Sequence, residues 1–97
     1  MKSWKEKITV PESIELGEIK SPYNFEVKFD IEDLEGLTNL RTSTSCGCTT
    51  IEKLVPKEGE NVLKSQITRE TKGEGFIGIN YWLGQERLTT KVKFKII

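Results

Sequence analysis

The chain has 97 residues, and its 15 basic and 15 acidic side chains leave a formal net charge of zero, with no histidine anywhere in the sequence. A chain of this length usually forms one domain, so we expect a single domain over residues 1–97. Nucleic-acid-binding domains carry an excess of positive charge, and the balance seen here argues against a nucleic-acid partner.

Histidine is the commonest general base and the commonest metal ligand in proteins. Because the sequence contains none, most familiar hydrolase sites are excluded, and we expect a protein that is not an enzyme and has no cofactor. No stretch approaches the roughly 20 apolar residues of a membrane-spanning helix, and residues 1–7 lack the apolar block of a signal peptide. We therefore expect neither membrane insertion nor export.

Short alternating segments separated by turn residues run along the whole chain. Alternation of apolar and polar residues is typical of strands with one buried and one wet face. The clearest cases are residues 25–31 and residues 88–96, where apolar side chains alternate mainly with charged ones. The expected strands, in chain order, are residues 7–10, 14–19, 25–31, 37–44, 49–54, 62–67, 76–83 and 88–96.

The segment 76–83 shows which of its faces is buried. Ile77, Ile79 and Tyr81 fall on one face, and Trp82 falls on the other. We expect the isoleucine face to be inward and Trp82 to lie outward or at the rim.

No segment carries a convincing helical stripe with caps, so we expect almost no helix. These candidate segments amount to about seven short strands with turn signals every 8 to 12 residues or so. In a chain near 100 residues that pattern predicts an all-β fold of the immunoglobulin-like type. The fold class is therefore a seven-stranded immunoglobulin-like β-sandwich, with a small barrel as the alternative.

One family resemblance extends over residues 8–96. It rests on Ile14-Glu15-Leu16-Gly17, the segment 25–31, Ser45-Cys46-Gly47-Cys48-Thr49, the turn at 56–60 and Gly75. This order resembles a bacterial immunoglobulin-like family of unknown function that carries an S-C-G-C-T signature and is related in fold to ASH and major-sperm-protein-like domains. Membership would imply an exported or lipid-anchored envelope protein. The chain departs from that family, because it lacks the export segment and has Glu35-Gly36 where the family has an Asn-x-Gly turn.

A stand-alone immunoglobulin-like domain that starts at its own methionine is also similar to the small decoration and adaptor domains of phage particles. That similarity is an analogy at the level of the fold.

Cys46 and Cys48 flank Gly47, and residues two apart on a strand point to the same face. Three interpretations stay open. The favoured one makes both residues small apolar core side chains, as free cysteines commonly are. A disulfide is the second, although neighbours on one strand face lie near the upper distance limit for a bridge. Redox exchange or metal capture is the third, since paired thiols can resolve mixed disulfides and thiolates bind soft metals.

Trp4, Tyr23 and Trp82 are the candidate interface residues, because Trp and Tyr combine a large contact area with a polar group. The sequence as a whole favours a non-enzymatic immunoglobulin-like structural or adaptor module in a larger assembly, with protein partners that include other copies of itself. The phage analogy makes it a virion decoration or accessory structural protein, located in the virion or the cytoplasm. The alternatives are a redox or metal-handling protein using Cys46 and Cys48, and an envelope-associated binding domain.

Overall fold

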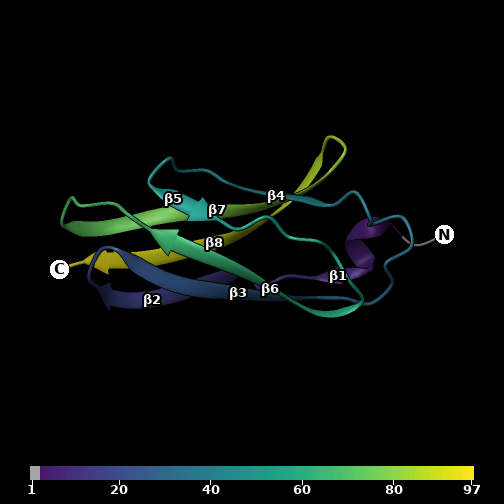
Figure 1. Cartoon of the computed structure of the whole chain (residues 1–97), viewed down its shortest axis with the longest axis horizontal. Helices are drawn as coiled ribbons and strands as arrows, with labels where there is room; N and C mark the ends of the chain where they lie inside the picture. The colour runs from purple at the N-terminus through teal and green to yellow at the C-terminus, as the bar shows by residue number, and fades with distance from the viewer. Residues whose placement is uncertain (1–2) are drawn as a thin grey trace.

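The computed structural model describes residues 3–97, and within that range it contains eight strands and one short 3-10 helix (Figure 1). The predicted domain also includes residues 1–2, which lie outside the described range. No helix in the described range is long and apolar enough to cross a membrane. The elements, in chain order, are η1 (Trp4–Glu6), β1 (Ile8–Thr9), β2 (Ser13–Ile19), β3 (Tyr23–Ile31), β4 (Arg41–Thr44), β5 (Thr49–Ile51), β6 (Gly59–Ile67), β7 (Gly73–Leu83) and β8 (Glu86–Ile96).

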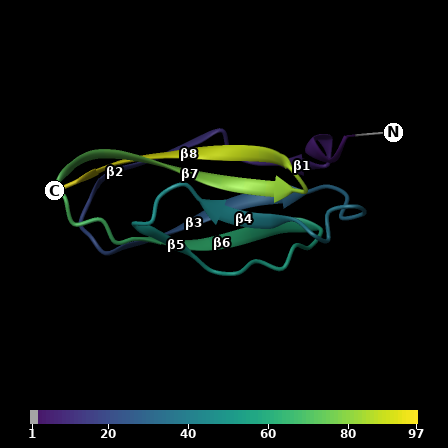
Figure 2. The ribbon, with the colours of Figure 1, turned by 90° about the horizontal axis from the view of Figure 1, so that it is seen from above.

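The strands form two four-stranded sheets packed face to face, so the predicted all-β sandwich is confirmed (Figure 2). One sheet has the order β1-β3-β6-β5, and the other has the order β2-β8-β7-β4. All neighbours are antiparallel except β2 and β8, which are parallel.

The expected number of seven strands is wrong, because the structure has eight in residues 3–97. The chain pairs with β3 along β1, leaves that sheet at residues 10–12, and joins the opposite sheet beside β8 along β2. Pro11 lies in this link and has no N–H to continue a strand ladder, so the pairing stops there. The predicted segments 7–10 and 14–19 thus belong to different sheets.

The core forms where the inward side chains of the two sheets meet. Phe29 from β3 and Tyr81 from β7 pack edge to face, with ring centroids 5.2 Å apart. Ile77 and Ile79 are buried beside Tyr81, whereas Trp82 is only half-buried, which confirms the predicted faces of this strand. The buried apolar residues are Ile8, Ile19, Phe25, Val27, Phe29, Ile31, Leu37, Leu40, Leu63, Ile67, Ile77, Ile79, Tyr81, Val92, Phe94 and Ile96.

Three predicted strands are shorter than expected, and the first of them, β1, has only two residues. Residues 37–40 form turns, because the N–H of Leu37 donates to the carbonyl of Leu34 and the N–H of Leu40 donates to that of Leu37. Turns repeated every three residues bury both Leu37 and Leu40, whereas a strand would direct them to opposite faces. The prediction of a strand over residues 37–40 is therefore wrong. Strand β5 likewise ends at Ile51 rather than at residue 54.

A buried chain of hydrogen bonds holds the link between β1 and β2. The Thr90 hydroxyl donates to the Pro11 carbonyl at 2.6 Å and lies 2.8 Å from the Tyr81 hydroxyl. Because the Thr90 proton is used on Pro11, the Tyr81 hydroxyl is the donor of the second bond. Burial raises the pKa of Tyr81 above its usual value of 10.0, with the Thr90 hydrogen bond acting in the opposite direction.

Replacing Thr90 with Val is expected to lower the free energy of unfolding by about 2 to 3 kcal/mol, because the half-buried Pro11 carbonyl and the buried Tyr81 hydroxyl both lose their partner. Urea unfolding measures the change. The control is Thr50→Val on the exposed face of β5, which we expect to stay within about 0.5 kcal/mol. Equal effects of the two changes would contradict the role given to Thr90.

Stability should fall with pH above about pH 10 in a way that depends on Tyr81. The folded state keeps the Tyr81 proton to higher pH than the unfolded state, so above pH 10 the unfolded chain binds fewer protons and the free energy of unfolding decreases. Urea unfolding from about pH 8 to pH 11 should give a smaller decrease for Tyr81→Phe than for the unchanged protein, since the two proteins differ only in this phenol group. Parallel curves would contradict this assignment.

Candidate functional site

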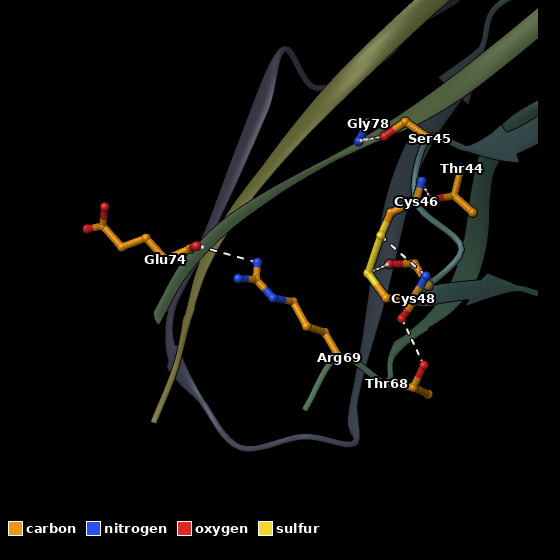
Figure 3. Close-up of a disulfide and its surroundings, with 9 residues drawn as sticks. Thr44, Ser45, Cys46, Cys48, Thr68, Arg69, Glu74 and Gly78 are labelled. Atoms are coloured by element: carbon orange, nitrogen blue, oxygen red, sulfur yellow. Dashed lines mark hydrogen bonds between the residues drawn. A yellow bond between two sulfur atoms is a disulfide. The ribbon is translucent and has the colours of Figure 1, made fainter. Parts of the chain in front are cut away.

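The Cys46–Cys48 segment lies in the turn between β4 and β5, where the chain crosses from one sheet to the other (Figure 3). The two cysteines form a disulfide, with their Cα atoms 5.2 Å apart. The favoured prediction of two free core thiols on one strand is therefore wrong. In a strand their Cα atoms would be about 6.6 Å apart, but here the Thr49 N–H donates to the Cys46 carbonyl at 3.2 Å and closes a turn.

The ends of this turn are fixed to both sheets by hydrogen bonds. On one side, Ser45 exchanges two bonds with Gly78 of β7: its N–H donates to the Gly78 carbonyl at 2.9 Å, and its hydroxyl accepts from the Gly78 N–H at 2.8 Å. On the other side, the Cys48 carbonyl accepts from both the N–H and the hydroxyl of Thr68, at 2.8 and 2.9 Å. Figure 3 shows these contacts on either side of the sulfur atoms. The turn thus has anchors that do not depend on the disulfide.

The two sulfur atoms have different polar neighbours. The N–H of Cys48 donates to the sulfur of Cys46 at 3.3 Å, whereas the sulfur of Cys48 lies 3.8 Å from the Thr49 hydroxyl. Both cysteines are half-buried against the core, and Gly47 between them is exposed. In residues 3–97, no group of three or more Cys, Asp or Glu side chains is arranged to hold a metal ion.

The three predicted interface aromatics do not form one surface. Trp4 donates through its indole N–H to Glu86 at 3.0 Å, and Trp82 donates to the Ser43 hydroxyl at 2.9 Å. Tyr23 begins β3 and is, like the two tryptophans, half-buried. The indole N–H groups of both tryptophans are thus already hydrogen-bonded within the chain.

The most exposed large apolar side chains are ones that the sequence analysis did not select. Val55, Phe76 and Ile97 are 78%, 69% and 46% exposed. Phe76 lies on the outer face of β7, where the Lys93 ammonium is 5.8 Å from its ring centroid. The sequence could have identified Phe76 as outward-facing, since Ile77 was predicted to point inward and neighbours on a strand point to opposite faces.

The outer edge of β3 is open over most of its length. Strand β1 has two residues and covers only Asp30 and Ile31. Over the range 23–29, no strand within residues 3–97 pairs with this edge. The N–H of Glu32 donates to the Lys7 carbonyl at 2.7 Å, so the even-numbered residues of β3 direct their peptide groups toward this edge.

No family model and no curated protein matches the chain. Among solved structures, a GH5 xyloglucanase from Bacteroides ovatus, in complex with a XXXG heptasaccharide, is similar with a TM-score of 0.66 and 15% identity over 93% of this chain. The Vibrio cholerae VesB protease is similar with a TM-score of 0.58 and 6% identity over 94% of this chain. The chain spans 19% and 32% of these two proteins. The solution structure of Amebosin is similar with a TM-score of 0.53 and 17% identity over 88% of both chains. These likenesses show the fold alone.

Replacing both cysteines, as Cys46→Ser with Cys48→Ser, should lower the free energy of unfolding by no more than about 2 kcal/mol. The disulfide closes a segment of three residues, for which the chain-entropy relation gives about 1.6 kcal/mol, and the Ser45 and Thr68 anchors remain. Urea unfolding followed by tryptophan fluorescence measures the change. Loss of cooperative unfolding in the double variant would show that the disulfide is essential to the fold.

Proposed function

We propose that this protein is a non-enzymatic immunoglobulin-like adaptor module that joins protein chains through the open edge of β3, with a second copy of itself as the partner. The observation that carries the proposal is the uncovered edge over residues 23–29. Unpaired strand edges are templates for another strand, because their N–H and carbonyl groups are already aligned.

The strand order supports the immunoglobulin-like part of the proposal. In a constant-type immunoglobulin domain, strands A, B, E and D form one sheet and strands C, F and G form the other. If β1 and β2 are the two halves of strand A, the sheet β1-β3-β6-β5 corresponds to A-B-E-D. The other sheet, β2-β8-β7-β4, then corresponds to G-F-C with the second half of strand A added beside G.

The charges along the edge favour a second copy as the occupant. Glu26 and Lys28 are exposed, and their peptide groups point to the open edge. If two β3 strands pair antiparallel about Val27, Glu26 of each copy lies opposite Lys28 of the other. Both positions then belong to the hydrogen-bonded type of pair, which gives roughly four backbone hydrogen bonds and two cross-strand ion pairs.

The same arrangement continues the core. Residues 25, 27 and 29 of β3 point inward and are buried, so antiparallel pairing about Val27 places Phe25 of one copy opposite Phe29 of the other. The two sheets would join over residues 25–29 of each copy. Residues 23–24 must turn away from the ladder there, because β1 of the other copy already pairs with Asp30 and Ile31. An interface of this size is small, which suits an adaptor that gains strength from repeated copies.

The larger assembly that we propose is a phage particle, and its support is the fold-level analogy with small decoration and adaptor domains. Mass spectrometry of purified particles from the source tests this part. The chain at a fixed stoichiometry in particles supports it, and its absence from every particle fraction contradicts it without bearing on the edge pairing.

Charge reversal at the edge tests the pairing itself. In Glu26→Lys, the introduced ammonium group would face Lys28 of the second copy twice per dimer, and Lys28→Glu creates the corresponding acidic clash. Each single variant should dimerise roughly tenfold more weakly than the unchanged protein, because each cross-strand charge pair contributes up to about 1 kcal/mol. Sedimentation velocity over a range of protein concentrations measures the dissociation constant.

The matched control is a mixture of the two single variants. In a heterodimer of a Glu26→Lys chain with a Lys28→Glu chain, each of the two cross-strand pairs joins a basic and an acidic side chain. Position 26 of the first chain is basic and faces the acidic position 28 of the second, whereas position 28 of the first is basic and faces the acidic position 26 of the second. Both pairs are attractive, so the mixture should form heterodimers although neither variant dimerises well alone.

Two outcomes would contradict the pairing at β3. One is an unchanged protein that stays monomeric at the highest concentration reached. The other is a mixture of the two variants that sediments as the sum of its parts.

A further inference from the structure

We propose that the Cys46–Cys48 disulfide is a thiol–disulfide exchange site that accepts two electrons from the thiols of a reducing partner. The proposal rests on the geometry of the turn between β4 and β5 and does not depend on pairing at β3. The edge-pairing proposal makes no use of this disulfide.

The turn keeps its place without the sulfur–sulfur bond. Ser45 is fixed to Gly78 on β7, and the Cys48 carbonyl is fixed by two bonds from Thr68. The bridge joins residues only two apart, so it restricts the unfolded chain far less than a long-range disulfide does. A disulfide with so little to stabilise can open and close while the sandwich stays folded.

The site lies at the surface of the molecule. Both cysteines are half-buried, whereas Gly47 between them is exposed. A Cβ atom at Gly47 would meet nothing within 4 Å beyond its two chain neighbours, so no other segment covers the turn at this point. Exposed disulfides are the ones that exchange readily, because the attacking sulfur must reach one of the two bridged sulfur atoms.

The hydrogen bonds give the exchange a direction. The Cys48 N–H already points at the sulfur of Cys46 at 3.3 Å, so negative charge that develops on Cys46 meets a donor in place. The sulfur of Cys48 has only the Thr49 hydroxyl, at 3.8 Å. Cys46 is thus the better leaving group, and attack takes place on Cys48.

The exchange proceeds in two balanced steps. A donor thiolate attacks the sulfur of Cys48, the Cys46–Cys48 bond breaks, and Cys46 leaves as a thiolate while the donor and Cys48 share a mixed disulfide. A second donor thiolate then attacks the donor sulfur of that mixed disulfide and releases Cys48 as a thiolate. The donor thiols become a disulfide, the protein gains two electrons, and the two protons given up by the donor thiols are available to Cys46 and Cys48.

The first experiment treats the native protein with dithiothreitol and follows free thiols by mass after quenching with N-ethylmaleimide. We expect complete reduction in the absence of denaturant, with the circular dichroism spectrum unchanged. Reduction that occurs only in unfolding concentrations of urea would overturn the proposal.

The second experiment identifies the attacked sulfur. Brief treatment with reduced glutathione, followed by the same quench and peptide mapping, should place glutathione on Cys48 and N-ethylmaleimide on Cys46. Glutathione on Cys46, or equally on both, would overturn the assigned direction.

Variants with a single cysteine give an independent measure of how strongly each thiolate is stabilised. Iodoacetamide at neutral pH should label Cys46 in Cys48→Ser severalfold faster than Cys48 in Cys46→Ser, because only Cys46 has a main-chain donor at its sulfur. The matched reference is Thr50→Cys in the chain that lacks both native cysteines, since Thr50 is exposed on the adjacent strand β5. Labelling of Cys46 no faster than this reference thiol would contradict the proposed stabilisation of its thiolate.

Discussion

The position at which the first strand changes sheets determines much of this molecule. The Thr90 hydroxyl, itself bonded to Tyr81, holds the Pro11 carbonyl in the link where the chain leaves the side of β3 and begins to run beside β8. That change leaves β1 with two residues and β3 with an uncovered edge, while the outer edge of β8 is covered by β2. A longer β1 would have covered β3 and removed the surface on which we base the adaptor function. The open edge is thus a consequence of how the core is hydrogen-bonded, not of the edge residues themselves.

The disulfide turn is a second crossing between the sheets, and it is built in a different way. At the first crossing the backbone is held by side chains from the core, whereas at the second it is held by Ser45 and Thr68 at the surface. Both cysteines stay half-buried there. The two crossings therefore differ in role, because the first sets the arrangement of the sheets and the second holds the disulfide on which we base the exchange site.

The sequence predicted the faces of the long strands well, and for a clear reason. Phe29, Ile79 and Tyr81 lie in segments long enough for a period of two to show which side is buried. The short segments gave less information. Residues 37–40 were predicted as part of a strand but form consecutive turns. Cys46 and Cys48 were placed on a strand because the turn closed by Thr49 has no signature beyond a single glycine. The open edge could not be predicted, since it depends on which strand pairs with which, and pairing depends on contacts between distant segments.

The parallel pairing of β2 with β8 has a mechanical consequence. The first described residues and the C-terminus lie at opposite ends of the long axis (Figure 1). These two strands are close to the two chain ends and have six paired positions in parallel register. Tension applied between the ends would therefore pull β2 and β8 past each other, and the hydrogen bonds between them would be loaded in shear, all at once, rather than opened one after another. A module connected this way resists stretching with its whole strand pair.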